Sequence, residues 1–227
     1  MSDSATLLNI DYHSWLQAFR GISRATDKRT FLTSGLPRSG AGNSAPILNY
    51  ETGPAIAAAL VMANMNSLPL DWAARLSVGG TNMNFFIVKQ LPVFPPEAYL
   101  QRPHPHMETY AELIVPRVLE LVYTVTEDLQ GFARDLGYDG PPFPWDGDRR
   151  HRIQSELDAI FARMYRLDRS DLEWILDPSP PSLSFSVLQE NELAEFSEYR
   201  TKLLVLQAFD QLTQGDPPTL QGAEAKL

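Results

Sequence analysis

The sequence predicts an α+β protein, with a small mixed β/α lobe in residues 1–96 and a mainly helical lobe in residues 116–213. Two observations predict this arrangement. Residues 15–33 have the aromatic and β-type composition of a bent strand pair. From position 116 onward, apolar residues instead recur at the three- and four-residue spacing of amphipathic helices. Residues 97–115 are expected to form a linker, and residues 214–227 a disordered tail.

The composition is that of a globular protein. A chain of 227 residues can bury roughly 70–75% of its unfolded surface, which is enough for a core without covalent cross-links. The absence of cysteine excludes a disulfide framework, a zinc-thiolate site and a cysteine nucleophile, and it fits a reducing cytoplasm. The N-terminus does not resemble a signal peptide, and the longest apolar stretch, residues 54–65, is too short to span a bilayer. We therefore expect a cytoplasmic protein with no membrane partner.

The net charge of −9 argues at first sight against nucleic acid as a partner. The charge is unevenly distributed, however. Residues 1–96 hold seven Lys or Arg and five Asp or Glu, whereas residues 97–227 hold 12 basic and 23 acidic residues. A mildly basic part joined to a strongly acidic part indicates a different partner for each. An acidic protein with an uneven surface charge and no such division of roles is the alternative interpretation.

Within the first lobe, residues 34–49 are rich in Gly, Pro, Ser and Asn and are expected to form an exposed loop. The glycines of this loop could belong to a dinucleotide or methyl-donor site, but such a site requires a strand–loop–helix unit that is not found around them. Helices are expected over residues 54–67 and 70–77, since a proline stands at or just before the first turn of each. We expect Trp72 and Leu76 on the buried side of the second helix.

Residues 78–96, VGGTNMNFFIVKQLPVFPP, close the first lobe. Gly79 and Gly80 can stop a helix and turn the chain, and the two asparagines that follow suit tight turns. The apolar run 85–88 is expected to be buried. Prolines then exclude a central strand, so residues 91–95 are expected to form a short edge strand or an extended exit.

In the second lobe we expect helices over residues 116–129, 148–166, 171–176 and 190–212. The arginines of the second of these could lie on DNA phosphates, but the acidic residues among them favour ion pairs between helices. In the linker, a metal site at His104 and His106 would need a third ligand within reach, which favours a solvated loop instead.

Several segments carry a resemblance to one family. Residues 78–96 resemble the segment that closes the target-recognition domain of adenine-specific type IIG restriction-modification methylases, and type I specificity subunits have a looser version of it. Residues 19–30, FRGISRATDKRT, resemble the recognition-domain strand of that family. Residues 132–143, FARDLGYDGPPF, and 198–202, EYRTK, resemble its helical tail. The resemblance covers most of the chain, from about residue 15 to residue 212.

The resemblance implies DNA recognition without catalysis. The catalytic half of such enzymes has a Gly-rich loop that binds S-adenosylmethionine and an Asn-Pro-Pro-aromatic motif that clamps a flipped adenine. Neither motif occurs in the sequence, and no cluster of acids and Lys suited to a nuclease metal lies in residues 1–96. The family therefore implies no cofactor in this chain, with the methyl donor bound by a methylase or nuclease subunit in trans.

Two functions from different classes follow. The first is a DNA target-recognition module for double-stranded DNA, in which Arg and Lys contact phosphates and loop side chains read base edges. Its candidate DNA-binding residues are Arg20, Arg24, Lys28, Arg29, Arg38, Asn43 and Ser44. The second is a non-catalytic protein-interaction subunit or truncated remnant, whose acidic tail would bind a partner without any contact to DNA. Clustering of the basic residues on one face would favour the first.

Overall fold

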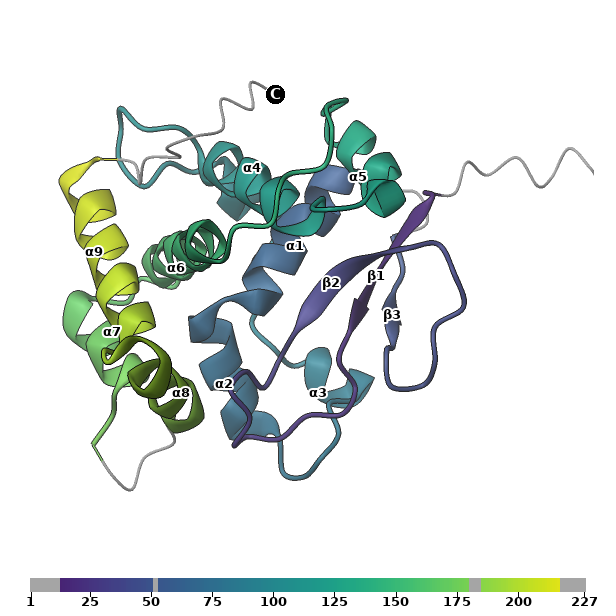
Figure 1. Ribbon diagram of the computed structural model, residues 1–227. Coiled ribbons are helices and arrows are strands. Elements are labelled where there is room, and N and C mark those ends of the chain that lie inside the picture. The colour runs from purple at the N-terminus through teal and green to yellow at the C-terminus, as the bar shows by residue number, and fades with distance from the viewer. Residues whose placement is uncertain (1–12, 51–52, 180–184, 217–227) are drawn as a thin grey trace, which may run out of the picture.

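The computed structural model describes residues 13–50, 53–179 and 185–216 (Figure 1). It confirms the α+β class, because a three-stranded antiparallel sheet near the N-terminus is followed by helices. The central strand β1 (Trp15–Phe19) pairs with β2 (Thr33–Pro37) on one side and β3 (Ile47–Leu48) on the other. Trp15 and Phe19, which alternate with Leu16 and Ala18 along β1, are almost fully buried.

Helices make up most of the remainder. They are α1 (Ala55–Asn66), α2 (Leu68–Ser77), α3 (Phe85–Val88), α4 (Tyr110–Val122), α5 (Gln130–Asp135), α6 (Gly147–Met164), α7 (Arg169–Leu176), α8 (Ser186–Phe196) and α9 (Arg200–Gln214), with 3-10 turns η1 (Pro96–Leu100) and η2 (Glu127–Leu129). None of those in the described ranges is both long and apolar enough to cross a membrane.

One main core joins both halves of the chain. Trp15 and Met62 from the first half share it with Ile114 of α4, Phe161 of α6 and Val205 of α9. The expected linker takes part in this packing, since Tyr99 and Met107 are buried in the same core. A smaller cluster joins the end of β1 to α2 and α3. It includes Phe19, Phe31, Leu70, Met83 and Val88.

Two predicted helices are wrong in their bounds. The first begins earlier, at Tyr110, where Thr109 and Glu112 form a capping box, and it ends at Val122. Val125 then has a φ of 68°, a left-handed conformation that stops any continuation. The last predicted helix is two helices, because Ser197 has a φ of 61° and separates α8 from α9.

The segment that closes the first lobe, residues 78–96, also differs from its prediction. The described residues 91–95 form no strand, and the run 85–88 forms the short helix α3. Its burial was predicted wrongly: Val88 is buried, whereas Phe86 is 76% exposed. On α2, Leu76 is exposed because Asp71, Ala74 and Arg75 occupy the buried side.

The junction of α8 and α9 is held by a buried carboxylate. Glu192 accepts hydrogen bonds from the Thr201 amide at 2.7 Å and the Thr201 hydroxyl at 2.5 Å. His151 on α6 places Nε2 2.8 Å from that hydroxyl oxygen and 3.4 Å from the carboxylate. Burial raises the pKa of Glu192, but the hydrogen bonds from His151 and Thr201 outweigh it, and the pKa lies below its ordinary value.

This environment gives a pH-dependent prediction for Glu192→Gln. Because the pKa is lower in the folded than in the unfolded chain, the stability from ionised Glu192 is present above about pH 4.5 and is lost as the pH falls through the folded value. We expect the difference in melting temperature between the parent and E192Q to shrink on acidification. Parallel melting curves across that range would contradict this role for the charge.

Candidate nucleic-acid interface

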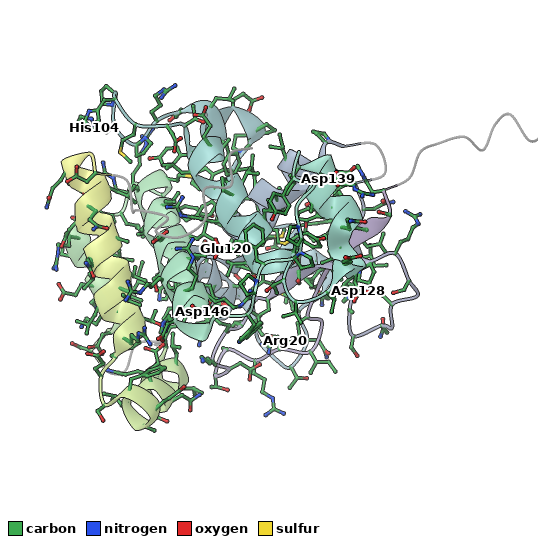
Figure 2. The ribbon with its side chains drawn as sticks, turned by 45° about the horizontal axis from the view of Figure 1, so that its top comes forward. Arg20, His104, Glu120, Asp128, Asp139 and Asp146 are labelled. Carbon is green, nitrogen blue, oxygen red and sulfur yellow. The ribbon has the colours of Figure 1, made fainter. Side chains whose placement is uncertain are left out.

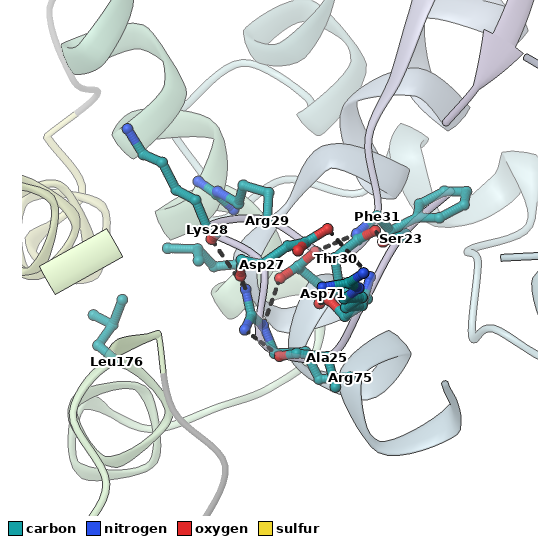
Figure 3. Close-up of polar contacts among 12 residues, drawn as sticks. Ser23, Ala25, Asp27, Lys28, Arg29, Thr30, Phe31, Asp71, Arg75 and Leu176 are labelled. Carbon is teal, nitrogen blue, oxygen red and sulfur yellow. Dashed lines mark hydrogen bonds and ion pairs between the residues drawn. The ribbon is translucent and has the colours of Figure 1, made fainter. Parts of the chain in front are cut away.

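The loop of residues 20–31, which carries four of the predicted DNA-binding residues, is wrapped around one buried arginine (Figure 3). Arg75 of α2 is 2% exposed. Its guanidinium donates hydrogen bonds to the backbone oxygens of Ala25 at 2.7 Å, Asp27 at 2.7 Å and Lys28 at 3.0 Å. Three carbonyls converge on one planar cation, so the conformation of the loop depends on the position of a single side chain.

Asp71 holds the arginine in place and extends the network. Its Oδ2 accepts from Arg75 Nε at 2.9 Å, and its Oδ1 accepts from the Phe31 amide at 2.6 Å. On its other side, the guanidinium carbon of Arg75 lies 4.2 Å from the ring centroid of Phe185, at the start of α8. Burial lowers the pKa of Arg75, whereas the Asp71 carboxylate acts to raise it.

A second ion pair ties the same loop to α6. Arg29 donates to Asp158 Oδ2 at 3.1 Å, and Asp158 Oδ1 accepts from the Leu68 amide at 2.7 Å. Burial alone would lower the pKa of Arg29, but the carboxylates of Asp158 and Asp71 raise it above its ordinary value. Burial likewise raises the pKa of Asp158, against the effect of Arg29.

Two of the predicted DNA-binding arginines are therefore engaged within the chain. Arg29 is bound to Asp158. Arg20 forms an ion pair with Asp27 at 3.1 Å and also donates to the backbone oxygen of Arg29, while its Nε is buried with no partner in the described ranges. Both guanidiniums are paired within the chain and shape the loop, although the Arg20 side chain is 38% exposed.

Arg24 and Lys28 are exposed on the same loop, and neither forms an ion pair with any residue that the structure describes. Asn43 and Ser44 are also exposed and lie next to the base of this loop, because the Gly21 amide donates to the Ser44 carbonyl oxygen at 2.8 Å. A Cβ at Gly21 would lie 3.2 Å from that oxygen, so glycine permits the close approach.

Arg38 lies elsewhere. It follows the end of β2, where Pro37 pairs with Trp15, and its guanidinium donates to the His13 carbonyl oxygen at 3.0 Å. The 20–31 loop begins at the opposite end of the strand pair, where Phe19 pairs with Thr33. Four residue steps along β1 separate the two ends by about 13 Å. The structure therefore brings together the other candidates but not Arg38.

A third loop, which was not predicted as part of the site, completes this surface. The Ser23 amide donates to the Thr81 carbonyl oxygen at 2.9 Å, the Met83 amide donates to Gly21, and Ile22 pairs with Asn82. We call the end of the lobe formed by residues 20–31, 40–46 and 78–84 the loop end; in Figure 1 the first and third of these loops lie below α2 and α3, and the second lies beside β3. Lys89, at the end of α3, is exposed beside it.

Carboxylates are scarce in the described sequence of the small lobe. In residues 13–50 and 53–96 there are seven Lys or Arg and two carboxylates, Asp27 and Asp71. Asp27 is bound to Arg20, and Asp71 is buried on Arg75. By contrast, Figure 2 labels Asp128, Asp139 and Asp146 over the helical part, where all three are exposed, and Arg20 at the small lobe.

The exposed side chains of the loop end are thus cationic, amide, hydroxyl and apolar. Such a surface can bind phosphates through Arg24, Lys28 and Lys89 and can hydrogen-bond to bases through Asn43 and Asn82. Among the described residues, no three His, Asp or Glu side chains gather in a way that could hold a metal ion.

No known family model, no curated protein and no solved structure matches this chain.

Proposed function

We propose that this chain is a DNA target-recognition module, non-catalytic by itself, that binds double-stranded DNA through its loop end and works with a methylase or nuclease subunit in trans. The observation that carries the proposal is the charge pattern of the small lobe. Its two described carboxylates are both bound to arginines, whereas Arg24, Lys28 and Lys89 are exposed. Duplex DNA is strongly anionic, and each phosphate neutralised by a cation contributes to affinity.

The rigidity of the loop end supports the same proposal. Reading base edges requires side chains held in fixed positions, which a loop anchored by buried polar contacts provides. Arg75 and Arg29 supply those contacts for the 20–31 loop, and backbone hydrogen bonds join the other two loops to it. The resemblance of residues 19–30 and 78–96 to a recognition domain falls on two of the three segments that meet here.

A salt titration of binding to mixed-sequence duplex DNA tests the proposal. With three exposed cations on phosphates, the slope of log K against log salt is expected to be about −3. Replacing Arg24, Lys28 or Lys89 singly by alanine is expected to reduce its magnitude by about 1. Arg134→Ala is the matched control, since Arg134 is exposed on the helical part beside Asp139. Absence of salt-dependent binding would refute the proposal.

The second candidate is a protein-interaction subunit that does not bind DNA. The observation that favours it is the acidity of residues 97–227, which hold 23 of the 28 acidic residues. Such a surface repels DNA and suits a basic protein partner. The same salt titration distinguishes the two functions, because a protein-interaction subunit is expected to show no duplex binding. For that subunit, Arg24→Ala is also expected to leave association with its protein partner unchanged.

A further inference from the structure

Three large apolar side chains are exposed at the loop end and on the adjoining helix α3. Phe86 is 76% exposed, Ile22 59% and Phe85 44%. They belong to adjoining segments, since Ile22 pairs with Asn82, three residues before the start of the helix that carries both phenylalanines. We call these three residues the apolar tip. Large apolar side chains exposed on adjoining segments mark a candidate binding site, and the tip is one.

The tip is held firmly by the core. The ring of Phe85 packs edge-on against the buried ring of Phe19, with centroids 5.3 Å apart and planes at 88°. At the start of α3, the side-chain oxygen of Asn84 accepts from the Ile87 amide at 3.1 Å. Gln90 Nε2 donates to the Phe86 carbonyl oxygen at 2.9 Å. These contacts fix the backbone under Phe86 while its ring stays in solvent.

The charge around the tip favours an anionic partner. From Trp72 to Pro96 the sequence contains no Asp or Glu, and its charged residues are Arg75, which is buried, and Lys89, which is exposed. Arg24 lies two residues from Ile22 on the other segment. An apolar surface bordered by cations and amides suits an anionic partner that also presents flat apolar faces. DNA bases between phosphate strands are such a partner, because every base has a stacking face.

We propose that the apolar tip contacts bases that are unstacked in the bound DNA, with Phe86 entering a base step and Ile22 and Phe85 supporting it. This inference rests on the proposed function. Apolar side chains that enter a duplex partly unstack the step and bend the helix, and the cost is lowest at flexible pyrimidine–purine steps. The module is therefore expected to favour target sites that contain such a step, in addition to any bases read by its loops.

Permanganate oxidation of thymines in mixed-sequence duplex DNA, measured together with affinity, tests the inference. Bound parent protein is expected to make thymines at TA steps reactive. Phe86→Ala is expected to abolish that reactivity and to weaken binding roughly fivefold to a hundredfold, as when one stacked base contact is lost. Leu100→Ala is the matched control, because Leu100 is 71% exposed on η1, and it is expected to change neither quantity.

The outcomes separate the two proposals. Binding by the parent protein with no thymine reactivity, or with Phe86→Ala unchanged in both measurements, overturns the inference and leaves the DNA-binding module in place. If Phe86→Ala binds DNA normally but no longer co-elutes with a methylase subunit that the parent retains, the tip is a protein interface and the inference is overturned. Absence of duplex binding by the parent overturns the inference and the proposed function together.

Discussion

Replacing Arg75 by methionine is expected to lower the free energy of unfolding by about 3–5 kcal/mol. Methionine fills much of the space but removes the cation beside the Asp71 carboxylate, which is 0% exposed and keeps its hydrogen bond from the Phe31 amide. It also removes the guanidinium that donates hydrogen bonds to the carbonyl oxygens of Ala25, Asp27 and Lys28, which lie on the loop proposed to contact DNA. Urea denaturation followed by circular dichroism measures the loss.

Two further variants show whether the buried charge is the cause. The double variant Arg75→Met/Asp71→Leu removes both charges and is expected to recover part of the loss, because an apolar pair of similar volume can replace a buried ion pair. Arg134→Ala disrupts an ion pair between side chains that are 57% and 77% exposed and is expected to change stability little. If R75M were no less stable than R134A, the network around Arg75 would not organise the loop.

The same substitution is expected to expose the loop to protease. Arg24 and Lys28 are trypsin sites on the surface of a loop that Arg75 holds closed. Local opening that precedes cleavage depends on the free energy of the contacts that close the loop. Native-state trypsin digestion is therefore expected to cut R75M after Lys28 faster than the parent protein, with cleavage after Arg134 as the internal reference.

Much of the fold could be predicted from local signals. The helices α1, α2 and α6 follow from proline positions and apolar spacing, which are properties of neighbouring residues. The split between α8 and α9 could not be predicted in this way, because the apolar spacing continues through Ser197 although its backbone is left-handed. The exposure of Phe86 breaks the rule that apolar runs are buried, and such exceptions are expected at functional surfaces.

For the candidate site, the exposure of several side chains could be predicted from the sequence, but the pairing of its arginines could not. Arg24, Asn43 and Ser44 are exposed as expected at the loop end. Arg29 is not available there, because its partner Asp158 lies 129 residues further along the chain, and no local pattern connects the two. Contacts with residues distant in the sequence decide which cations of a basic segment are paired. The sequence alone therefore cannot show that Arg24 is exposed while Arg29 is paired.

Asp158 is expected to be the other position at which one substitution has a large effect. Its carboxylate bonds to the first amide of α2, Leu68, while the Ser67 hydroxyl that could have capped this helix bonds to the Asn64 carbonyl oxygen. Asp158 thus acts as an N-terminal cap of α2 that is supplied by α6. Its negative charge also interacts favourably with the positive end of the α2 helix dipole. Asp158→Ala is expected to cost about 3–5 kcal/mol, because Arg29 also loses its buried partner.

Asp158→Asn is expected to cost less than Asp158→Ala, since the amide oxygen can still accept from Leu68. Chemical denaturation at neutral pH measures both. Equal losses would show that the charge pair with Arg29, and not the cap, accounts for the whole effect. Arg29→Met supplies the complementary deletion, because it removes the cation and leaves the carboxylate that caps α2 in place.

The pH dependence of Arg29→Met then separates an ion pair from a simple hydrogen bond. Burial raises the pKa of Asp158 in the folded chain, so the stability linked to this carboxyl is highest in acid and falls as the pH rises through the folded value. Without Arg29 that pKa rises further, and keeping Asp158 ionised at neutral pH costs more. The deficit of R29M against the parent is therefore expected to be largest near pH 7 and to shrink toward pH 4. A deficit that stayed constant with pH would mean that Arg29 stabilises the fold through packing and neutral contacts, and that its charge is not what anchors the loop to α6.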